Sequence, residues 1–151
     1  MLLCVATAAG AGFAPLAPGT AGAAVGVALY FPLAGLGPWL YALATLVLLS
    51  IGIRAADAAE RWYGRKDDGR IVIDEVVGQL IALAPLALPG VGSSWLSVVT
   101  GFVAFRVFDV WKPAPVRRAE RLGGGAGVML DDVVAGALAA PVVAGVLWVV
   151  G

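Results

Sequence analysis

The chain has 151 residues, of which 61% are hydrophobic and only 13% are charged. A soluble domain carries about 25% charged residues, so this composition excludes an ordinary soluble protein. The ten basic and ten acidic residues cancel, which argues against a nucleic-acid-binding protein with a basic surface. The chain contains no histidine, which excludes phosphohistidine chemistry and a Ser-His-Asp triad.

Apolar segments predict the helices in chain order. The first, Leu2–Phe13, has only about 12 residues and suits a re-entrant or interfacial helix better than a full span. Longer apolar helices are predicted over Thr20–Gly35, Pro38–Tyr63, Ile71–Leu88, Ser94–Trp111 and Val128–Val150. We therefore expect an all-α, polytopic helical membrane protein. It would form a single domain over residues 1–151, with about four to five membrane-embedded helices plus the short N-terminal helix.

Several small or rigid residues predict details of these helices. Gly22 and Gly26 are spaced for close helix approach. Pro32 and Pro85 are expected to kink or interrupt their helices, and Ser94 suits an N-cap.

Basic residues predict the orientation in the membrane. They cluster at two junctions between predicted helices. Around the charged end of the Pro38–Tyr63 helix lie Arg54, Arg61, Arg65, Lys66 and Arg70. After the Ser94–Trp111 helix lie Lys112, Arg117, Arg118 and Arg121. The turns between them, Leu36–Gly37 and Gly90–Ser93, carry no charge. Because basic loops stay on the cytoplasmic side, both junctions are expected to face the cytoplasm.

Five carboxylates fall at helix ends on this same side. Asp74 and Glu75 begin one apolar helix, Asp109 ends the next, and Asp131 with Asp132 begin the last. An acid at the edge of an apolar helix is costly and indicates a functional site. Helix capping is the alternative explanation for either pair. Converging acidic pairs would repel each other without a cation, and their hard oxygen ligands suit Mg²⁺.

Positive and glycine-rich elements near these acids suggest phosphate binding. Arg106, Asp109 and Lys112 are three residues apart, so Asp109 can interact with either cation. Arg106 is too deep for simple anchoring at the interface and needs an acidic partner or an anionic ligand. Gly123–Gly127 is either a flexible loop or a phosphate cradle at a helix start. Thr20 is an N-cap or a hydroxyl that faces the site.

Four blocks of sequence resemble the bacterial phosphatidylglycerophosphatase A family: Gly10–Thr20, Ile73–Gly78, Phe105–Arg117 and Gly124–Gly136. The resemblance implies a helical, Mg²⁺-dependent enzyme of the inner membrane. Such an enzyme removes the terminal phosphate of phosphatidylglycerophosphate and leaves phosphatidylglycerol. The matching positions are Asp74, Glu75, Asp109, Asp131 and Asp132 among the acids, and Arg106, Lys112 and Arg117 among the cations; Asp67 also matches.

Together these observations predict a phosphomonoesterase at the cytoplasmic face of the bacterial inner membrane. Mg²⁺ would be held among Glu75, Asp109, Asp131 and Asp132 and would lower the pKa of a bound water. Asp74 is the candidate general base, with direct attack by an aspartate as the rival route. The expected phosphate-binding residues are Arg106, Lys112, Arg117 and Thr20.

Two other functions were weighed. A lipid phosphotransferase also uses aspartate clusters with Mg²⁺, but its spaced Asp-Gly and Ala-Arg pattern is missing here. A cation carrier or scaffold is the non-enzymatic alternative, but the outer halves of the helices lack the polar groups that transport needs. The expected partners are the phospholipid substrate and the bilayer, with no nucleic acid. The sequence does not indicate an oligomeric state.

Overall fold

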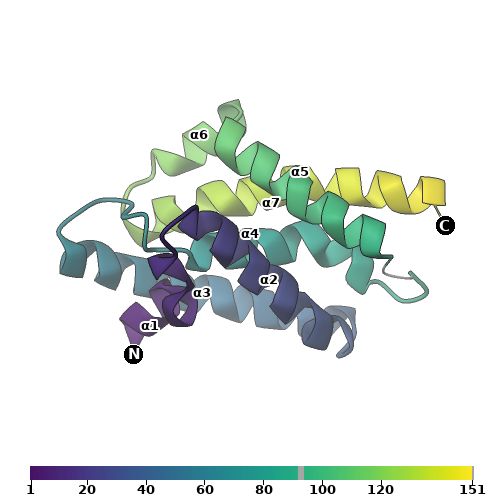
Figure 1. Ribbon diagram of the computed structural model, residues 1–151, viewed down its shortest axis with the longest axis horizontal. Helices are drawn as coiled ribbons and strands as arrows, with labels where there is room; N and C mark the ends of the chain where they lie inside the picture. Colours follow the sequence, from purple (N-terminus) through teal and green to yellow (C-terminus); the bar gives the residue numbers. More distant parts are fainter. Residues whose placement is uncertain (92–93, 151) are drawn as a thin grey trace.

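The computed structural model describes residues 1–91 and 94–150, and all regular structure within them is helical (Figure 1). The elements are α1 (Leu2–Ala6), η1 (Ala8–Phe13), α2 (Pro18–Ala34), α3 (Pro38–Tyr63), α4 (Ile73–Leu83), η2 (Ala84–Ala87), α5 (Trp95–Trp111), α6 (Ala114–Glu120) and α7 (Gly124–Val150). The predicted all-α fold is therefore confirmed. The uncharged turn predicted at residues 90–93 falls partly outside the described residues.

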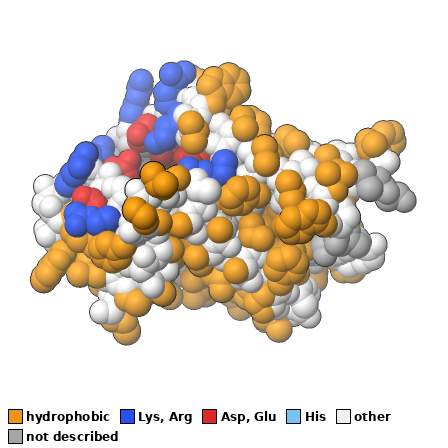
Figure 2. Space-filling view, viewed as in Figure 1, with side chains coloured by type: hydrophobic (Ala, Val, Ile, Leu, Met, Phe, Trp, Pro, Cys, Tyr) orange, Lys and Arg blue, Asp and Glu red, His pale blue; other side chains and the backbone are white. Residues whose placement is uncertain are grey.

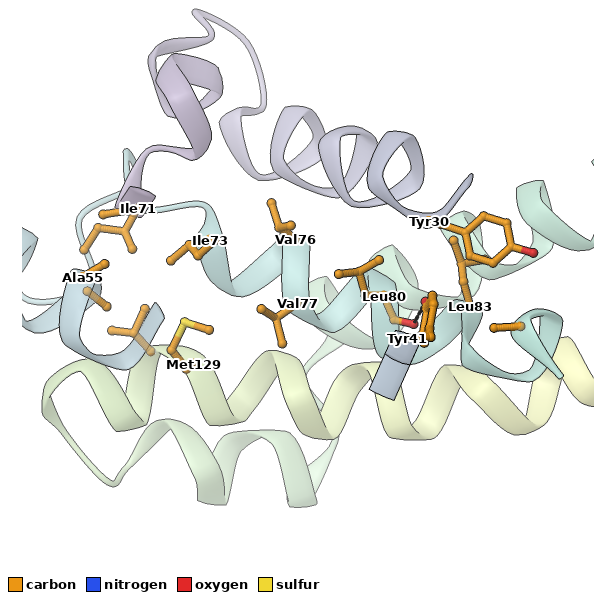
Figure 3. Close-up of a cluster of buried hydrophobic side chains, with 14 of the residues drawn as sticks. Tyr30, Tyr41, Ala55, Ile71, Ile73, Val76, Val77, Leu80, Leu83 and Met129 are labelled. Atoms are coloured by element: carbon orange, nitrogen blue, oxygen red, sulfur yellow. Dashed lines mark hydrogen bonds between the residues drawn. The ribbon is translucent and has the colours of Figure 1, made fainter. Parts of the chain in front are cut away.

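Helix α4 forms the centre of the bundle. Nine of its eleven residues are buried, and it contacts α2, α3, α5 and α7. Its side chains Val76, Val77 and Leu80 belong to a continuous buried cluster (Figure 3). A helix that is buried on every side reads as hydrophobic all round, which explains why this segment looked like a membrane span in the sequence.

Glycines let the neighbouring helices lie directly against α4. A Cβ atom on Gly26 of α2 would lie 2.7 Å from Cβ of Gln79, and one on Gly136 of α7 would collide with the carbonyl oxygen of Gly78. The close approach predicted at Gly22 and Gly26 is confirmed, since a Cβ atom on Gly22 would also lie only 2.8 Å from Cβ of Val72. Because α7 contacts the backbone of α4, the side chains near this contact on both helices are brought close together.

Two helices, α3 and α7, are long and apolar enough to cross a membrane. Only 28% of each apolar stretch is buried within the bundle. The exposed large apolar side chains of α3 include Trp39, Leu40, Leu43, Leu46, Val47 and Ile51. An exposed apolar face of this extent is typical of contact with another apolar phase, and it indicates a membrane-associated protein.

The two long helices are fewer than the four to five membrane-embedded helices predicted. The predicted Ile71–Leu88 helix is shorter because α4 ends at Leu83 and a 3₁₀ turn containing Pro85 follows. Helix α5 has 17 residues, and α2 is a shorter apolar helix. Pro32 lies inside α2, which ends two residues later at Ala34.

Three local predictions at helix starts can be compared with the structure. The side chain of Ser94 accepts a hydrogen bond from the Ser97 N–H at 3.1 Å, so the predicted N-cap is confirmed. Thr20 is not a cap, because α2 already begins at Pro18 with Ala17 as its N-cap. The predicted Leu2–Phe13 helix is divided into α1 and η1, with left-handed backbone at Ala9.

Charged side chains gather at one end of the molecule, near the end of α3 and beside α6, while apolar side chains cover most of the rest of this face (Figure 2). The same end holds the C-terminal end of α5 and the N-terminal ends of α4 and α7 (Figure 1). The fold therefore brings together the helix ends that carry the acidic residues.

Candidate active site

Three carboxylates converge where α4 meets α7. Asp74 and Glu75 lie in the first turn of α4, and Asp132 comes from the third turn of α7. One oxygen of each lies within 4.8 Å of the others, and the set could hold a metal ion. Asp74 and Asp132 are buried, with 8% and 2% exposure, and Glu75 is partly buried. We call these three residues the carboxylate cluster.

Each member of the carboxylate cluster has a buried oxygen without a hydrogen-bond partner: Asp74 Oδ1, Glu75 Oε2 and Asp132 Oδ2. A buried carboxylate oxygen is costly unless a hydrogen bond, an ion pair or a metal satisfies it. Converging carboxylates also repel each other. A hard divalent cation would resolve both costs, because it prefers oxygen ligands.

Helix capping does not explain these acids. Asp131 and Asp132 follow Gly124, the first residue of α7, by seven and eight residues, which is about two helical turns. They are therefore inside the helix, where the backbone N–H groups already have partners. At α4 the N-cap is Val72, and no side chain caps the helix.

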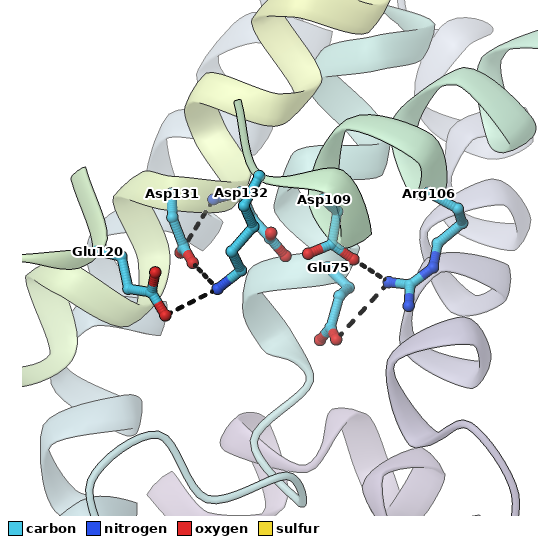
Figure 4. Close-up of polar contacts among 7 residues, drawn as sticks. Glu75, Arg106, Asp109, Glu120, Asp131 and Asp132 are labelled. Atoms are coloured by element: carbon cyan, nitrogen blue, oxygen red, sulfur yellow. Dashed lines mark hydrogen bonds and ion pairs between the residues drawn. The ribbon is translucent and has the colours of Figure 1, made fainter. Parts of the chain in front are cut away.

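Arg106 of α5 borders the carboxylate cluster. Its guanidinium forms an ion pair with Asp109, as the sequence predicted, and Nη1 lies 3.8 Å from Oε1 of Glu75. Figure 4 shows the side chains of Glu75, Asp109 and Asp132 pointing into the same space. The cation thus lies at the edge of a strongly negative region and is held there by a carboxylate from its own helix.

The second cation of the site, Lys112, belongs to a separate network. Its Nζ donates to Oε1 of Glu120 and to Oδ2 of Asp131, both at 3.0 Å (Figure 4). The sequence allowed a pair with Asp109, but Lys112 has left-handed backbone at the end of α5 and reaches α6 and α7 instead. We call Lys112, Glu120 and Asp131 the lysine cluster.

The lysine cluster holds one cation between two carboxylates. Burial alone would lower the pKa of Lys112, but the hydrogen bonds to Glu120 and Asp131 outweigh it and raise that pKa well above its usual value. The ammonium group therefore stays charged.

The glycine-rich segment begins a helix rather than forming a loop. Residues 124–127 form the first turn of α7, and the preceding segment contains α6, which the sequence did not predict. The N–H of Gly125 donates to Oδ1 of Asp57 at 2.5 Å. The predicted loop or phosphate cradle is therefore wrong here, since the protein's own carboxylate occupies this helix N-terminus.

Comparison with known proteins gives one family. The family model described as "PgpA: Phosphatidylglycerophosphatase A" matches residues 4–147. The chain belongs to the phosphatidylglycerophosphatase A family. This is a family of phosphoric monoester hydrolases.

Three relatives are similar to this chain over most of their length. A Bacteroides thetaiotaomicron protein named "Putative phosphatidylinositol-3-phosphatase" is 41% identical over 97% of this chain and 94% of its own. Phosphatidylglycerophosphatase A of Escherichia coli is 38% identical, over 94% of this chain and 78% of its own. That of Haemophilus influenzae is also 38% identical, over 89% and 81%. No solved structure matches the chain.

Three further residues that were considered for the site, Arg117, Asp67 and Thr20, lie outside the carboxylate cluster in the structure. Arg117 is exposed on α6, and Asp67 is exposed in the α3–α4 loop, where its N–H donates to Glu60 at 2.8 Å. Thr20 is exposed, whereas its neighbour Gly19 lies in the site. Functional roles for Arg117, Asp67 and Thr20 stay predictions.

Two residues near Glu75 were not predicted as site residues from the sequence. A Cβ atom on Gly19 would collide with Oε1 of Glu75 and lie 3.2 Å from Nη1 of Arg106, so a side chain there would displace the Glu75 carboxylate. Gln79, one turn after Glu75, is fully buried, and both polar atoms of its amide lack a partner. An amide in the otherwise apolar stretch of residues 76–83 was the available signal for Gln79.

Proposed function

We propose that this chain is a Mg²⁺-dependent lipid phosphatase that hydrolyses the terminal phosphomonoester of phosphatidylglycerophosphate. The products are phosphatidylglycerol and inorganic phosphate, as anionic phospholipid synthesis requires. One observation carries the proposal: three buried carboxylates with unpartnered oxygens converge beside the Arg106–Asp109 pair in a member of this family.

The carboxylate cluster has the donor set that Mg²⁺ takes in proteins, which is a few carboxylates completed by water and phosphate oxygens. In this proposal Asp74, Glu75 and Asp132 hold the ion. When bound, Mg²⁺ supplies charge neutralisation for the phosphoryl oxygens and a lowered pKa for water. Asp74 is thus a ligand here rather than the general base, because its Oδ1 is buried without a partner at the cluster.

The protein's own cations complete the phosphate site. Arg106, fixed by Asp109, would donate hydrogen bonds to the phosphoryl oxygens at the edge of the cluster. Lys112 adds a positive charge on the side of Asp131. The oxygen of water forms a bond to phosphorus, the bond from phosphorus to the glycerol oxygen breaks, and that oxygen takes up a proton.

We propose a multi-pass arrangement in the bacterial inner membrane, with the site facing the cytoplasm. Basic and acidic side chains gather at the same end of the molecule (Figure 2), and basic segments remain on the cytoplasmic side. The headgroup of the lipid would reach the site while its acyl chains stay in the bilayer. The shorter helices α2 and α5 would cross the membrane together with α3 and α7.

A second substrate has support from one relative. The Bacteroides thetaiotaomicron protein is named for a phosphoinositide. Phosphatidylinositol 3-phosphate and phosphatidylglycerophosphate have similar headgroups. In each, a phosphodiester joins a polyol to the lipid, and the polyol carries a phosphomonoester. The same centre could accept the monoester of either.

The test is phosphate release by the purified protein from each lipid, with Mg²⁺ and with a chelator. We expect Mg²⁺-dependent release from phosphatidylglycerophosphate and a slower rate with the phosphoinositide. The double variant Asp131→Asn with Asp132→Asn is the inactive control, and Arg118→Ala, an exposed residue of α6 outside the site, is the active one. Equal release by the wild type and the double variant would rule the proposal out.

A further inference from the structure

An open pocket of about 460 Å³ lies between the N-terminal segment and the loop that joins α3 to α4. Two of its lining residues, Arg65 and Arg70, are cations, and one, Asp68, is an anion. The pocket therefore has a net positive charge. The site described above does not include any of these three residues.

Arg70 is held rigidly in this pocket. It donates from Nε to Oδ1 of Asp68 at 2.6 Å and from Nη2 to Oδ2 at 2.9 Å, and its guanidinium lies 3.7 Å from the centre of the Tyr63 ring. Hydrogen bonds from Arg70 also lower the pKa of Asp68, so this carboxylate stays charged. Asp68 thereby balances the charge of Arg70.

Arg65 supplies the unbalanced charge. It forms no ion pair among the residues that the structure describes, and it is exposed at the pocket. In this pocket Arg65 offers its planar guanidinium to the oxygens of a phosphate, and Arg70 offers Nη1, since its Nε and Nη2 already donate to Asp68.

The pocket lies beside the carboxylate cluster, and the two are lined by consecutive residues of the sequence. Pro18 lines the pocket, and the next residue, Gly19, lies against Glu75 and Arg106. The loop is also clamped to the N-terminal segment, since the N–H of Val72 donates to the carbonyl of Ala6 at 2.9 Å. The pocket is therefore preformed and adjacent to the place where a phosphomonoester would bind.

We propose that this pocket, through Arg65 and the fixed Arg70, binds the phosphodiester of the lipid whose phosphomonoester occupies the carboxylate cluster. The inference rests on the proposed function, and it identifies the phosphodiester as the group by which the enzyme recognises its lipid substrate. A lipid with a monoester alone leaves the pocket empty, whereas a lipid with both phosphates spans the two sites. Arg65 is in this view a specificity determinant.

The experiment compares wild type with Arg65→Ala, Arg65→Lys and the control Arg61→Ala. Arg61 is an exposed arginine near the same end of α3 that does not line the pocket. Each protein is assayed on phosphatidylglycerophosphate in uncharged phosphatidylcholine vesicles. Inhibition by glycerophosphoglycerol, a soluble diester without acyl chains or a monoester, is measured in the same assay.

For Arg65→Ala we expect KM and the inhibition constant of the soluble diester each to rise about tenfold, or about 1.4 kcal/mol of binding. The kcat should stay within about twofold, Arg65→Lys should recover part of the loss, and Arg61→Ala should behave as wild type. An unchanged inhibition constant, or an equal effect in Arg61→Ala, would assign Arg65 to the membrane surface and overturn the inference. A wild type that releases no phosphate would instead refute the proposed function, and the pocket proposal with it.

Discussion

Asp131 and Asp132 are consecutive residues of one helix, yet their surroundings differ completely. Asp131 accepts a hydrogen bond from Lys112 at 3.0 Å in the lysine cluster, whereas Oδ2 of Asp132 is buried without a partner in the carboxylate cluster. Successive side chains on a helix point about 100° apart, so the pair serves two different neighbours. Lys112 stabilises the charge of Asp131, whereas the described residues provide no partner for Oδ2 of Asp132.

This contrast separates a carboxylate with a structural role, Asp131, from one that is available to a ligand, Asp132. Asp131 is buried, with 6% exposure, but Lys112 pairs with its carboxylate, and removal of that carboxylate leaves Lys112 with Glu120. Buried carboxylates that face each other without a cation are costly to fold. A protein retains such an arrangement when function requires it, as is common at sites with perturbed electrostatics.

Asp132→Asn tests the contrast most strongly. The substitution keeps the shape of the side chain and removes one charge from the carboxylate cluster. We expect kcat/KM to fall at least about 100-fold, because a metal ion supplies several kcal/mol to a phosphoryl-transfer transition state. Phosphate release measures the effect, and size-exclusion chromatography in detergent checks the fold. Activity within about threefold of wild type would remove Asp132 from the catalytic centre.

Mg²⁺ should stabilise the folded protein through the carboxylate cluster alone. At about 100 times the dissociation constant, binding to the native state adds about 2.7 kcal/mol. Thermal unfolding in detergent, with and without Mg²⁺, measures the resulting rise in Tm. We expect the rise in wild type and Asp131→Asn, and we expect none in Asp132→Asn. The same rise in all three proteins would mean that the ion binds elsewhere.

Gly136→Ala tests whether helix contact positions the carboxylate cluster. The new methyl group would collide with the carbonyl oxygen of Gly78, so α7 has to move away from α4. We expect a loss of about 1–3 kcal/mol in stability and a fall in activity of about tenfold, because Asp132 lies one turn before Gly136. Gly145→Ala is the matched control on α7, since a Cβ there meets open space. A similar loss in both variants would contradict this explanation.

The smallest effect is expected for Asp131→Asn. Lys112 keeps its hydrogen bond to Glu120, so activity should remain within about tenfold of wild type. The stability should fall by about 1.5 kcal/mol, because Asp131 is buried and the substitution weakens its hydrogen bond with a charged group. Activity assays and melting curves are compared with those of Asp132→Asn. An equal loss in the two variants would mean that both aspartates act as one unit.

Sequence patterns correctly predicted the features that depend only on residues close together in the chain. The Pro38–Tyr63 helix, the N-cap at Ser94 and the Arg106–Asp109 pair depend on neighbours within a turn or two, and the structure has all three. Hydrophobic length alone could not separate a buried helix from a membrane span. For that reason α4 was predicted too long, and only two of the predicted membrane helices, α3 and α7, are by themselves long and apolar enough to cross a membrane.

Contacts between distant segments were beyond the sequence. Nothing in the composition around Gly19 shows that α2 begins against Glu75, and nothing near Gly125 shows that Asp57 accepts its N–H. The choice between Asp109 and Asp131 as the partner of Lys112 depended on a single left-handed backbone angle at the end of α5. The five acids were found from the sequence, but their division into the two clusters required the fold.

The separation of α4 from α7 along the chain has a consequence for biosynthesis. Asp74 and Glu75 leave the ribosome more than fifty residues before Asp132, which belongs to the last described helix. Until α7 inserts beside α4, the nascent protein has two acidic residues at the membrane without the third carboxylate of their site. Insertion of α7 would therefore act as the step that matures the enzyme, so that chains stalled earlier in translation would be inert toward lipid.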